Sequence, residues 1–387
     1  MSDPVRLIYL DNAATTPVAP EVVDAMLPFY SEGYGNASSL HAAGRHARRA
    51  VEHARDELAR RLGFQSEEIV FTSGATEADN LALIGLFLAH PHKRRIVTCA
   101  VEHHAVLHAA SFLERQGAHV TVLPVDSVGR VDPEAVASAL TDDTLVVSIM
   151  AGSNEIGTVQ PIAEIASACR SRGVPFHTDA VQAFGKIPLS TDDVDLLSLS
   201  AHKFHGPKGV GLLAVRKGVR LRPVVHGGGH EGGLRSGTEN VPGIVGMSTA
   251  AAIAVDSMPE TAARMERLRQ RIVDAVREIP GSRHNGDPEN SLPHIVNASF
   301  AGIEGESLVM RLDERGVAAS TGSACSSPEL EASHVLRAIG VPLSMAHGSL
   351  RLSLGRQTSE AEIDEALRVL PEVIDDLRKI SPFKVGD

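Results

Sequence analysis

The chain has 387 residues, of which 43% are hydrophobic, and it carries a formal net charge of −11 at pH 7. This length is enough for one large domain and a second, smaller one, each with its own core. The acidic balance, without a block of Lys and Arg beside aromatic residues, argues against binding to nucleic acid or to an anionic membrane.

Segments for export or membrane insertion are not expected. The longest apolar run, Leu81 to Ala89, is too short to span a bilayer, and the N-terminus has no basic region followed by an apolar one. The three cysteines, Cys99, Cys169 and Cys325, show no CxxC spacing. This argues against a disulfide framework or a cysteine-rich zinc site, and we expect a protein of the reducing cytoplasm.

The first sixty residues are predicted to form a short strand, a turn and two helices. A strand at Tyr9 runs into a turn that ends at Pro17, and a helix is expected from Pro20 to Tyr30. Small polar residues at 33–39 indicate a loop. Apolar residues at helical spacing predict a long helix from His41 to Leu62.

The next strand, Glu68 to Phe71, leads into a candidate anion site. Residues 72–77 contain small hydroxyl residues and a glycine, and they open a helix that is predicted to run to Ala89. Such a helix start can bind an anion, because unpaired N–H groups and the helix dipole both face it. The same residues also suit an ordinary helix cap with a glutamate in the first turn, so both interpretations stay open.

Two further strands end in candidate polar groups. Arg95 to Cys99 leads to His103 and His104, and neighbouring histidines on a helix face different ways, which argues against a shared metal. Such a histidine can stack on a flat ring or move a proton, although His104 also fits a solvated position. The buried-looking strand Leu145 to Met150 leads to Asn154, which can bind a phenolate or a carboxylate, or simply form a turn.

The strands Val174 to Phe176 and Asp195 to Leu199 carry the most specific signal. They lead to Asp179 and Lys203, and alternation of strands and helices from residue 68 to 215 predicts a mostly parallel sheet. In such sheets ligands bind at the carboxyl edge of the strands. Pyridoxal phosphate (PLP) needs a lysine for its Schiff base and a carboxylate that keeps its ring nitrogen protonated.

An ion pair between Asp179 and Lys203 is the simpler alternative. Ser200 and His202, however, flank the lysine with donors that suit a phosphate, and Gly-Pro-Lys-Gly at 206–209 forces a tight turn. Lys208 lies beyond this turn and is expected to point elsewhere. With a PLP lysine in place, phosphate binding becomes the favoured function of the earlier helix start, through residues Gly74, Ala75 and Thr76.

The glycine-rich stretch 226–240 predicts a loop that something approaches closely. His226 and His230 lie in it, but no third metal ligand stands near them in the sequence. A helical region from Val241 to Ile279 is expected to lead into the second, smaller domain.

The C-terminal part alternates again, with a strand from Ile295 to Phe300 and a helix from Gly305 to Arg315. Cys325 then stands among Gly, Ala, Ser and Thr, either as a partly exposed thiol without a role or as a nucleophile on a loop that moves. A strand at 350–356 carries Arg351 and Arg356, and an arginine fork can bind a substrate carboxylate, with a surface charge as the alternative for Arg356 especially.

Ten segments together resemble the cysteine desulfurases of the NifS/IscS type, in order and at similar spacing from about Tyr9 to Lys379. They are YLDNAATT, GNASS, FTSGATEADN, VEHHAV, NEIGT, HTDAVQ, SAHKFHGPKGVG, RSGTEN, STGSACSS and RLSLGR. This is a PLP-dependent family of fold type I in the class V aminotransferase group. The segments GDPEN, AHGSLRLSLGR and SPFKVGD are closer to the NifS branch.

The resemblance implies an α/β fold with a mostly parallel seven-stranded sheet in a large domain, residues 17–258. Residues 1–16 together with 259–387 would form a smaller α/β domain that carries the cysteine loop. The implied reaction removes sulfur from L-cysteine, with PLP as cofactor, and gives L-alanine and a persulfide on Cys325. The implied partners are a second copy in a homodimer and an iron–sulfur scaffold protein of the IscU or NifU type as sulfur acceptor.

The resemblance also assigns roles to individual residues. Lys203 would hold PLP and act as a base once freed, Asp179 would pair with the pyridine nitrogen, and His103 would stack on the ring and transfer protons. The other implied cofactor contacts are Gln182, Asn154, Ala75, Thr76, Ser200 and His202, with Thr238 reaching the phosphate of the other subunit. The implied substrate contacts are Arg351, Asn154 and Asn36.

Two positions depart from the family pattern. Ser153 replaces the first of two asparagines, and His230 replaces a glutamine in the glycine-rich loop. A transaminase or a selenocysteine lyase is a rival function, and Cys325 discriminates against the transaminase, which needs no thiol. A catalytically dead partner would be expected to have lost Lys203 or Cys325.

Overall fold

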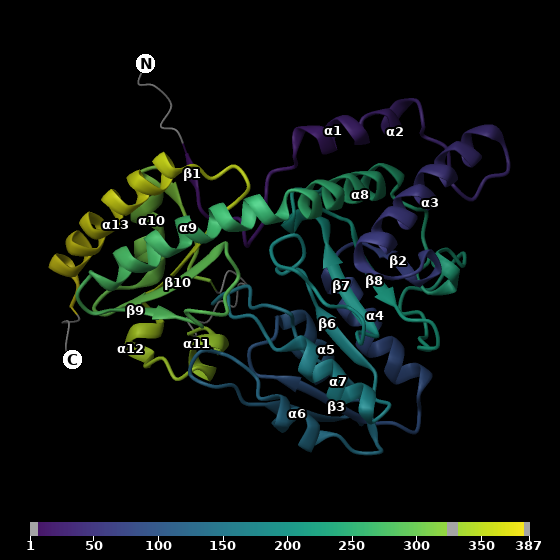
Figure 1. Ribbon diagram of the computed structural model, residues 1–387, viewed down its shortest axis with the longest axis horizontal. Helices are drawn as coiled ribbons and strands as arrows, with labels where there is room; N and C mark the ends of the chain where they lie inside the picture. Colours follow the sequence, from purple (N-terminus) through teal and green to yellow (C-terminus); the bar gives the residue numbers. More distant parts are fainter. Residues whose placement is uncertain (1–6, 323–331, 383–387) are drawn as a thin grey trace.

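A seven-stranded sheet lies at the centre of the larger part of the computed structural model, which describes residues 7–322 and 332–382 (Figure 1). β8 runs antiparallel to both of its neighbours, whereas all other adjacent strands are parallel. The prediction of a mostly parallel seven-stranded sheet is therefore confirmed. In spatial order the strands are β2 (Ile69–Thr72), β8 (Gly211–Val215), β7 (Leu196–Ser200), β6 (Phe176–Asp179), β5 (Thr144–Ser148), β3 (Arg95–Cys99) and β4 (His119–Leu123).

Helices cover both faces of this sheet, because successive strand residues point to opposite sides. On one face Val70 and Leu213 pack with α4 (Ala75–Ala89) and α5 (His104–Glu114). On the other face Phe71 and Leu212 share a core with a second set of helices. That set comprises α1 (Pro20–Met26), α3 (Ala42–Leu62), α6 (Pro133–Ala139), α7 (Ile162–Ser171) and α8 (Val241–Asp256).

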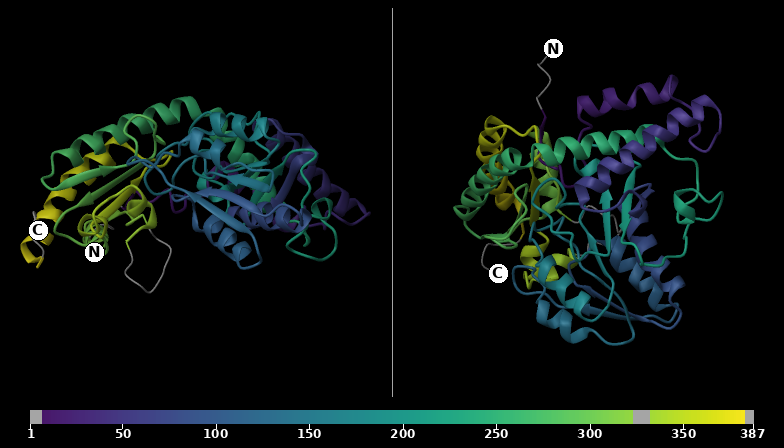
Figure 2. Two further views of the ribbon diagram at one scale, coloured as in Figure 1. Left: turned by 90° about the horizontal axis from the view of Figure 1, so that it is seen from below. Right: turned by 45° about the vertical axis from the view of Figure 1, so that its right-hand side comes forward.

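The C-terminal part has its own sheet and its own apolar core, and Figure 2 shows it in green and yellow beside the larger part. Its antiparallel strands lie in the order β12 (Ser349–Ser353), β10 (Ile295–Phe300) and β9 (Ser282–Asn285). The core combines Ile8 and Leu10 with residues between 265 and 377. The helices that pack in this core are α9 (Met258–Arg277), α10 (Gly305–Glu314) and α13 (Glu360–Ile380). The buried residues of α11 (His334–Ala338) and α12 (Leu343–Ala346) belong to the core of the large sheet.

Two predicted helices are each divided in the structure. The first breaks before α2 (Pro28–Ser31), and the second breaks at Ser257, where α8 and α9 meet at an angle of 70°. A proline follows each break, Pro28 in α2 and Pro259 in α9, and its missing N–H interrupts the helical hydrogen-bond ladder. No single helix in the described part of the chain is long and apolar enough to cross a membrane; only the bent α8–α9 pair, taken together, passes by length and composition.

The N-terminal segment connects the two sheets. β1 (Ile8–Tyr9) pairs in parallel with β11 (Val317–Ala318), and the Asn12 side chain donates to the carbonyl of Ser353 at 2.9 Å. A few residues on, the backbone N–H of Thr16 donates to the carbonyl of His202 at 3.0 Å. Residues 9–16 thus lie against both the C-terminal sheet and the turn after β7.

Candidate active site

A cavity of about 470 Å³ lies at the carboxyl edge of the large sheet. Five strand ends, those of β2, β3, β5, β6 and β7, lead into residues that line it. The sequence-predicted residues in its lining are Gly74, Ala75, Thr76, His103, Asn154, Asp179, Gln182, Ser200, His202 and Lys203. The fold therefore brings together side chains that are up to 128 residues apart in the sequence, as the numbers of Ala75 and Lys203 show.

Lys203 stands in a short 3₁₀ turn, η2 (Ala201–Lys203), directly after β7. The turn is closed by a hydrogen bond from the N–H of Gly206 to the carbonyl of Ala201 at 2.9 Å. A Cβ atom at residue 206 would lie 2.8 Å from the Cβ of Ala201, so this position requires glycine. The Nζ atom of Lys203 donates to the carbonyl oxygens of Ala13 and Ala14, both at 2.7 Å.

Asp179 places a buried carboxylate at the end of β6. One of its oxygens accepts a hydrogen bond from the N–H of Val181 at 2.9 Å. Burial raises the pKa of Asp179 from its ordinary value of 3.8 to about 6, against the opposing effects of that bond and of the Lys203 charge. A buried carboxylate of this kind is stabilised by a cation, and a protonated ring nitrogen would be one.

The opposite end of the cavity suits an anion. α4 begins at Ala75, and its N-cap, Gly74, provides no capping side chain. The carboxylate of Glu77 turns away to the N–H of Ser73 at 2.7 Å and to Nε of Arg235 at 2.9 Å. The helix N–H groups are therefore not capped by a side chain, which is the arrangement that binds phosphate.

The position of Lys208 differs from the one that we predicted. We expected it to point elsewhere because it lies beyond the turn that follows Lys203, but it lines the cavity. The turn reverses the chain and returns residue 208 toward the start of α4. With Lys208 in the lining beside Ser200 and His202, the residues present fit both ends of PLP.

His103 is the N-cap residue of α5, and its ring is neutral. Nδ1 accepts the N–H of Ala105 at 3.1 Å, so in the neutral ring the proton lies on Nε2. Burial, and after it the charges of Lys203, His334 and His108, lower the pKa of His103 to about 4. The ring is therefore neutral at pH 7.

Gln182 is fixed at both ends of its amide group. Its Nε2 donates to the carbonyl of Ala13 at 2.9 Å, and its Oε1 lies 3.1 Å from Nε2 of the buried His294. Because an amide oxygen only accepts, His294 donates in this contact. The amide orientation at the cavity wall is thus set by residues from two distant segments.

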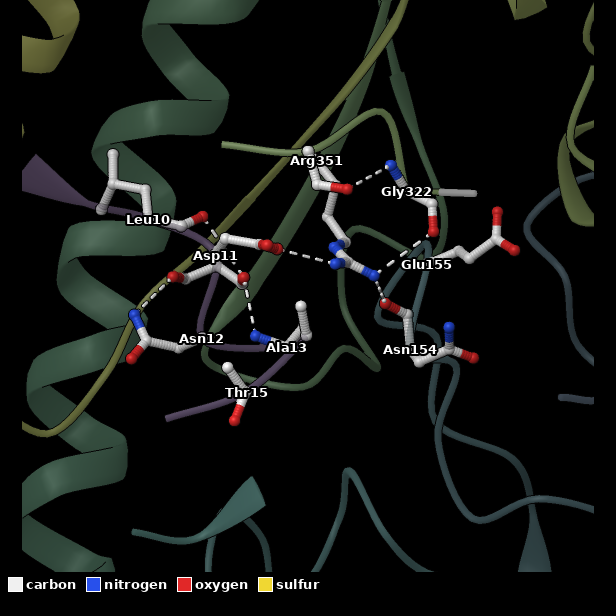
Figure 3. A network of polar contacts seen from close by, with 12 residues as sticks. Leu10, Asp11, Asn12, Ala13, Thr15, Asn154, Glu155, Gly322 and Arg351 are labelled. Carbon is white, nitrogen blue, oxygen red and sulfur yellow. Dashed lines mark hydrogen bonds and ion pairs between the residues drawn. The ribbon is translucent and has the colours of Figure 1, made fainter. Parts of the chain in front are cut away.

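Arg351, the predicted carboxylate ligand, lies on β12 of the C-terminal sheet, and Figure 3 shows its contacts with Asp11 and Asn154. Arg351 is 2% exposed. One terminal nitrogen donates to the carbonyl of Asn154 at 2.9 Å, and the other donates to Oδ1 of Asp11 at 2.8 Å. Asn154 itself lines the cavity, so Arg351 is joined to the cavity wall through this residue.

Besides Arg351, two predicted residues do not line the cavity in the described part of this single chain, Asn36 and Thr238. Asn36 is exposed, and its side chain accepts the N–H of Ser38 at 2.8 Å. Thr238 is also exposed. Cys325 lies outside the described residues. Of the nearby described residues, the carbonyl of Gly322 accepts a hydrogen bond from Arg351 at 3.4 Å, and the hydroxyl of Ser333 donates to Glu155 at 2.5 Å.

The other two cysteines are buried thiols. Cys99 donates to a carboxyl oxygen of Glu102 at 3.1 Å, and burial raises the pKa of this thiol. Burial also raises the pKa of Cys169 to about 12. Neither thiol is ionised near neutral pH, which fits the prediction that both are packing residues.

Residues 11–15 contribute to the site although their residue types did not predict it. Thr15 lines the cavity and contacts His202 at 3.1 Å, and the Ala13 and Ala14 carbonyls hold Lys203. The role of a backbone carbonyl cannot be read from residue type. The only sequence signal for residues 11–15 was therefore their place in the family motif YLDNAATT. Asp11, which contacts Arg351, was likewise missed.

A lysine and a carboxylate at adjacent strand ends, beside an uncapped helix start, define a PLP-dependent α/β enzyme. The family model described as aminotransferase class-V matches residues 8–366, so the chain belongs to this family, whose enzymes use PLP.

Individual relatives are more specific. The chain is 48% identical over 381 residues to a cysteine desulfurase IscS of Methanosarcina thermophila, covering 98% of this chain and 94% of the relative. A solved NifS-like protein aligns with a TM-score of 0.91 and 42% identity, over 96% of this chain and all of that one. The structure titled SspA in complex with cysteine aligns with a TM-score of 0.80 and 37% identity, over 91% of this chain and 99% of that one.

Proposed function

We propose that this protein is a cysteine desulfurase that removes sulfur from L-cysteine with PLP and gives L-alanine. The observation that carries the proposal is the convergence of Lys203, Asp179 and the α4 start on one cavity. Relatives of nearly equal length bear the name cysteine desulfurase, and one relative's structure is titled as a complex with cysteine. These findings support L-cysteine as the substrate.

PLP, when bound, withdraws electrons from the bonds around the Cα atom of an amino acid. The Asp179 carboxylate supports this by holding the proton on the ring nitrogen. Lys203 takes the proton from Cα, and the Ala13 and Ala14 carbonyls orient its amine. His103, neutral and protonated on Nε2, presents a flat ring and a proton-bearing atom to the cavity.

We assign the sulfur step to Cys325. Its thiolate attacks the substrate sulfur, an S–S bond forms, and the substrate C–S bond breaks with its electron pair left on carbon. That carbon takes a proton and becomes the methyl group of alanine, while the persulfide stays on Cys325. Sulfur is oxidised and carbon is reduced in the same step, so no outside oxidant or reductant is needed.

The expected partners follow from the same proposal. A second copy of the chain would supply Thr238 to the phosphate site, and the exposure of Thr238 outside the cavity supports this. The persulfide would pass to an iron–sulfur scaffold protein of the IscU or NifU type. The name cysteine desulfurase, which the relatives bear, supports the proposal that some acceptor takes the sulfur.

The decisive experiment follows alanine and sulfide during incubation with L-cysteine, with and without a candidate scaffold protein. The Cys325→Ala variant should keep the absorption of bound PLP but form neither persulfide nor sulfide. Cys99→Ala and Cys169→Ala are matched controls that should stay active, since both thiols are buried. Sulfide release by Cys325→Ala at the unmodified rate would replace the proposal with a plain PLP lyase.

A further inference from the structure

Arg351 already has a carboxylate partner in this structure. Asp11 accepts from its Nη2 at 2.8 Å, and the carbonyls of Asn154 and Gly322 accept from Nη1 at 2.9 and 3.4 Å (Figure 3). The Nε–H group is buried and has no hydrogen-bond partner among the described residues. The guanidinium is therefore fixed in place by two carbonyls while one edge contacts Asp11.

The two members of this ion pair differ in exposure. The side chain of Arg351 is 3% exposed, whereas that of Asp11 is 22% exposed. A buried guanidinium is costly without a counter-ion, whereas a carboxylate that reaches water can be solvated. Asp11 is therefore the partner that can leave when another carboxylate arrives.

The backbone around Asp11 is held in place. Asn12 donates from its side chain to the carbonyl of Ser353, and the N–H of Ala13 donates to the Ser353 hydroxyl, both at 2.9 Å. The hydroxyl of Tyr9 donates to the carbonyl of Asp11 at 3.1 Å. Rotation of the Asp11 side chain is thus the movement that frees Arg351, and the residues that hold Lys203 need not shift.

We propose that Asp11 is a resident counter-ion that occupies Arg351 between turnovers and sets the affinity of the site for carboxylates. This inference rests on the proposed function, which supplies an amino-acid substrate whose carboxylate reaches Arg351. Each incoming carboxylate must displace Asp11. Because L-cysteine and L-alanine carry the same carboxylate, Asp11 weakens the binding of both and thereby favours product release.

The experiment measures carboxylate binding directly, by calorimetric titration of the PLP-loaded enzyme with 3-mercaptopropionate. This probe has the carboxylate and the thiol of L-cysteine but no amine. Asp11→Asn keeps the shape of the side chain and removes its charge. We expect the Kd to fall about tenfold, the scale of one hydrogen bond between charged groups.

The kinetic constants should follow the same pattern. In Asp11→Asn the KM for L-cysteine and the inhibition constant of L-alanine should fall by similar factors. Binding of cysteamine, which has no carboxylate, should not change. If Asp11 had only a structural role, Asp11→Asn would melt at a lower temperature and bind carboxylates more weakly. Tighter binding despite a lower melting temperature therefore shows that Asp11 competes with carboxylates for Arg351.

The matched control is Glu21→Gln, which removes the more exposed Glu21–Arg356 pair at 3.4 Å and should leave the Kd unchanged. If Asp11→Asn does not fold, Asp11→Ser removes the carboxylate with a smaller side chain. An unchanged or raised Kd for 3-mercaptopropionate overturns the inference. Tightening without any alanine or sulfide production would instead uphold it and overturn the proposed desulfurase function.

Discussion

Asp179 should make the PLP-free protein less stable at neutral pH. Its pKa in the folded protein, raised mainly by burial to about 6, lies above the ordinary value of 3.8. At 1.36 kcal/mol per pH unit, this difference corresponds to about 3 kcal/mol. At pH 7 the Asp179→Asn variant should therefore be more stable, with a free energy of unfolding up to about 3 kcal/mol above that of the natural protein.

The pH dependence gives the sign of this effect. Below pH 3.8 the carboxyl is protonated in both the folded and the unfolded state, so it makes no difference to stability. The penalty grows as the pH rises from about 4 to 6, and it is complete above about 6. The stability advantage of Asp179→Asn should therefore be absent near pH 4 and full at pH 7.

The assay is urea unfolding of the PLP-free protein at several pH values and one fixed protein concentration. Asp24→Asn, which removes an exposed carboxyl, serves as the control and should show no such pH-dependent gain. In parallel, Asp179→Asn should bind PLP more weakly and lose activity, because the ring nitrogen has lost its counter-ion. A variant that is less stable than the natural protein at pH 7, or equally stabilised at pH 4 and 7, would refute the reasoning.

Three further predictions concern the cofactor site. Lys203→Ala should lose both activity and the borohydride-reducible absorption of lysine-bound PLP, and a reducible Lys203→Ala enzyme would contradict this assignment. Lys208→Ala should keep the absorption but bind PLP more weakly, because Lys208 lines the cavity. In mixed dimers of Lys203→Ala and Thr238→Ala chains, one site should combine both defects and the other neither, and unrecovered PLP affinity would place Thr238 in its own subunit's site. Gly206→Ala should cost about 1–3 kcal/mol in urea unfolding and weaken PLP binding, since its Cβ would lie 2.8 Å from that of Ala201; unchanged PLP affinity would argue against the tight turn as the support of Lys203.

Strand ends were the part of the site that residue types could reveal. Short apolar runs that stop at Asp179 and Lys203 identified two adjacent strands, and parallel pairing placed both groups at one edge. Lys208 was misplaced because distance along the chain beyond a turn does not say which way the chain returns. The helix breaks were missed because the apolar pattern continues through them, although Pro28 and Pro259 marked the positions.

Other parts of the site depend on contacts that residue types do not encode. The carbonyls of Ala13 and Ala14 hold Lys203 across about 190 residues of sequence. The roles of Asn36 and Thr238 came from the family resemblance alone, and a single chain does not bring either residue to the cavity. The division into domains at residues 17–258, like the NifS branch assignment, stays a prediction.

Because residues 9–16 contact both sheets, their contacts form in a fixed order during synthesis on the ribosome. The sheet that carries Asp179 and Lys203 is complete in sequence at Val215, but Arg351 and Ser353 emerge more than a hundred residues later. At about 5–20 residues per second, that interval is about 7 to 27 seconds. Residues 9–16 must therefore wait for β12, the last described strand, before their contacts with Arg351 and Ser353 are complete.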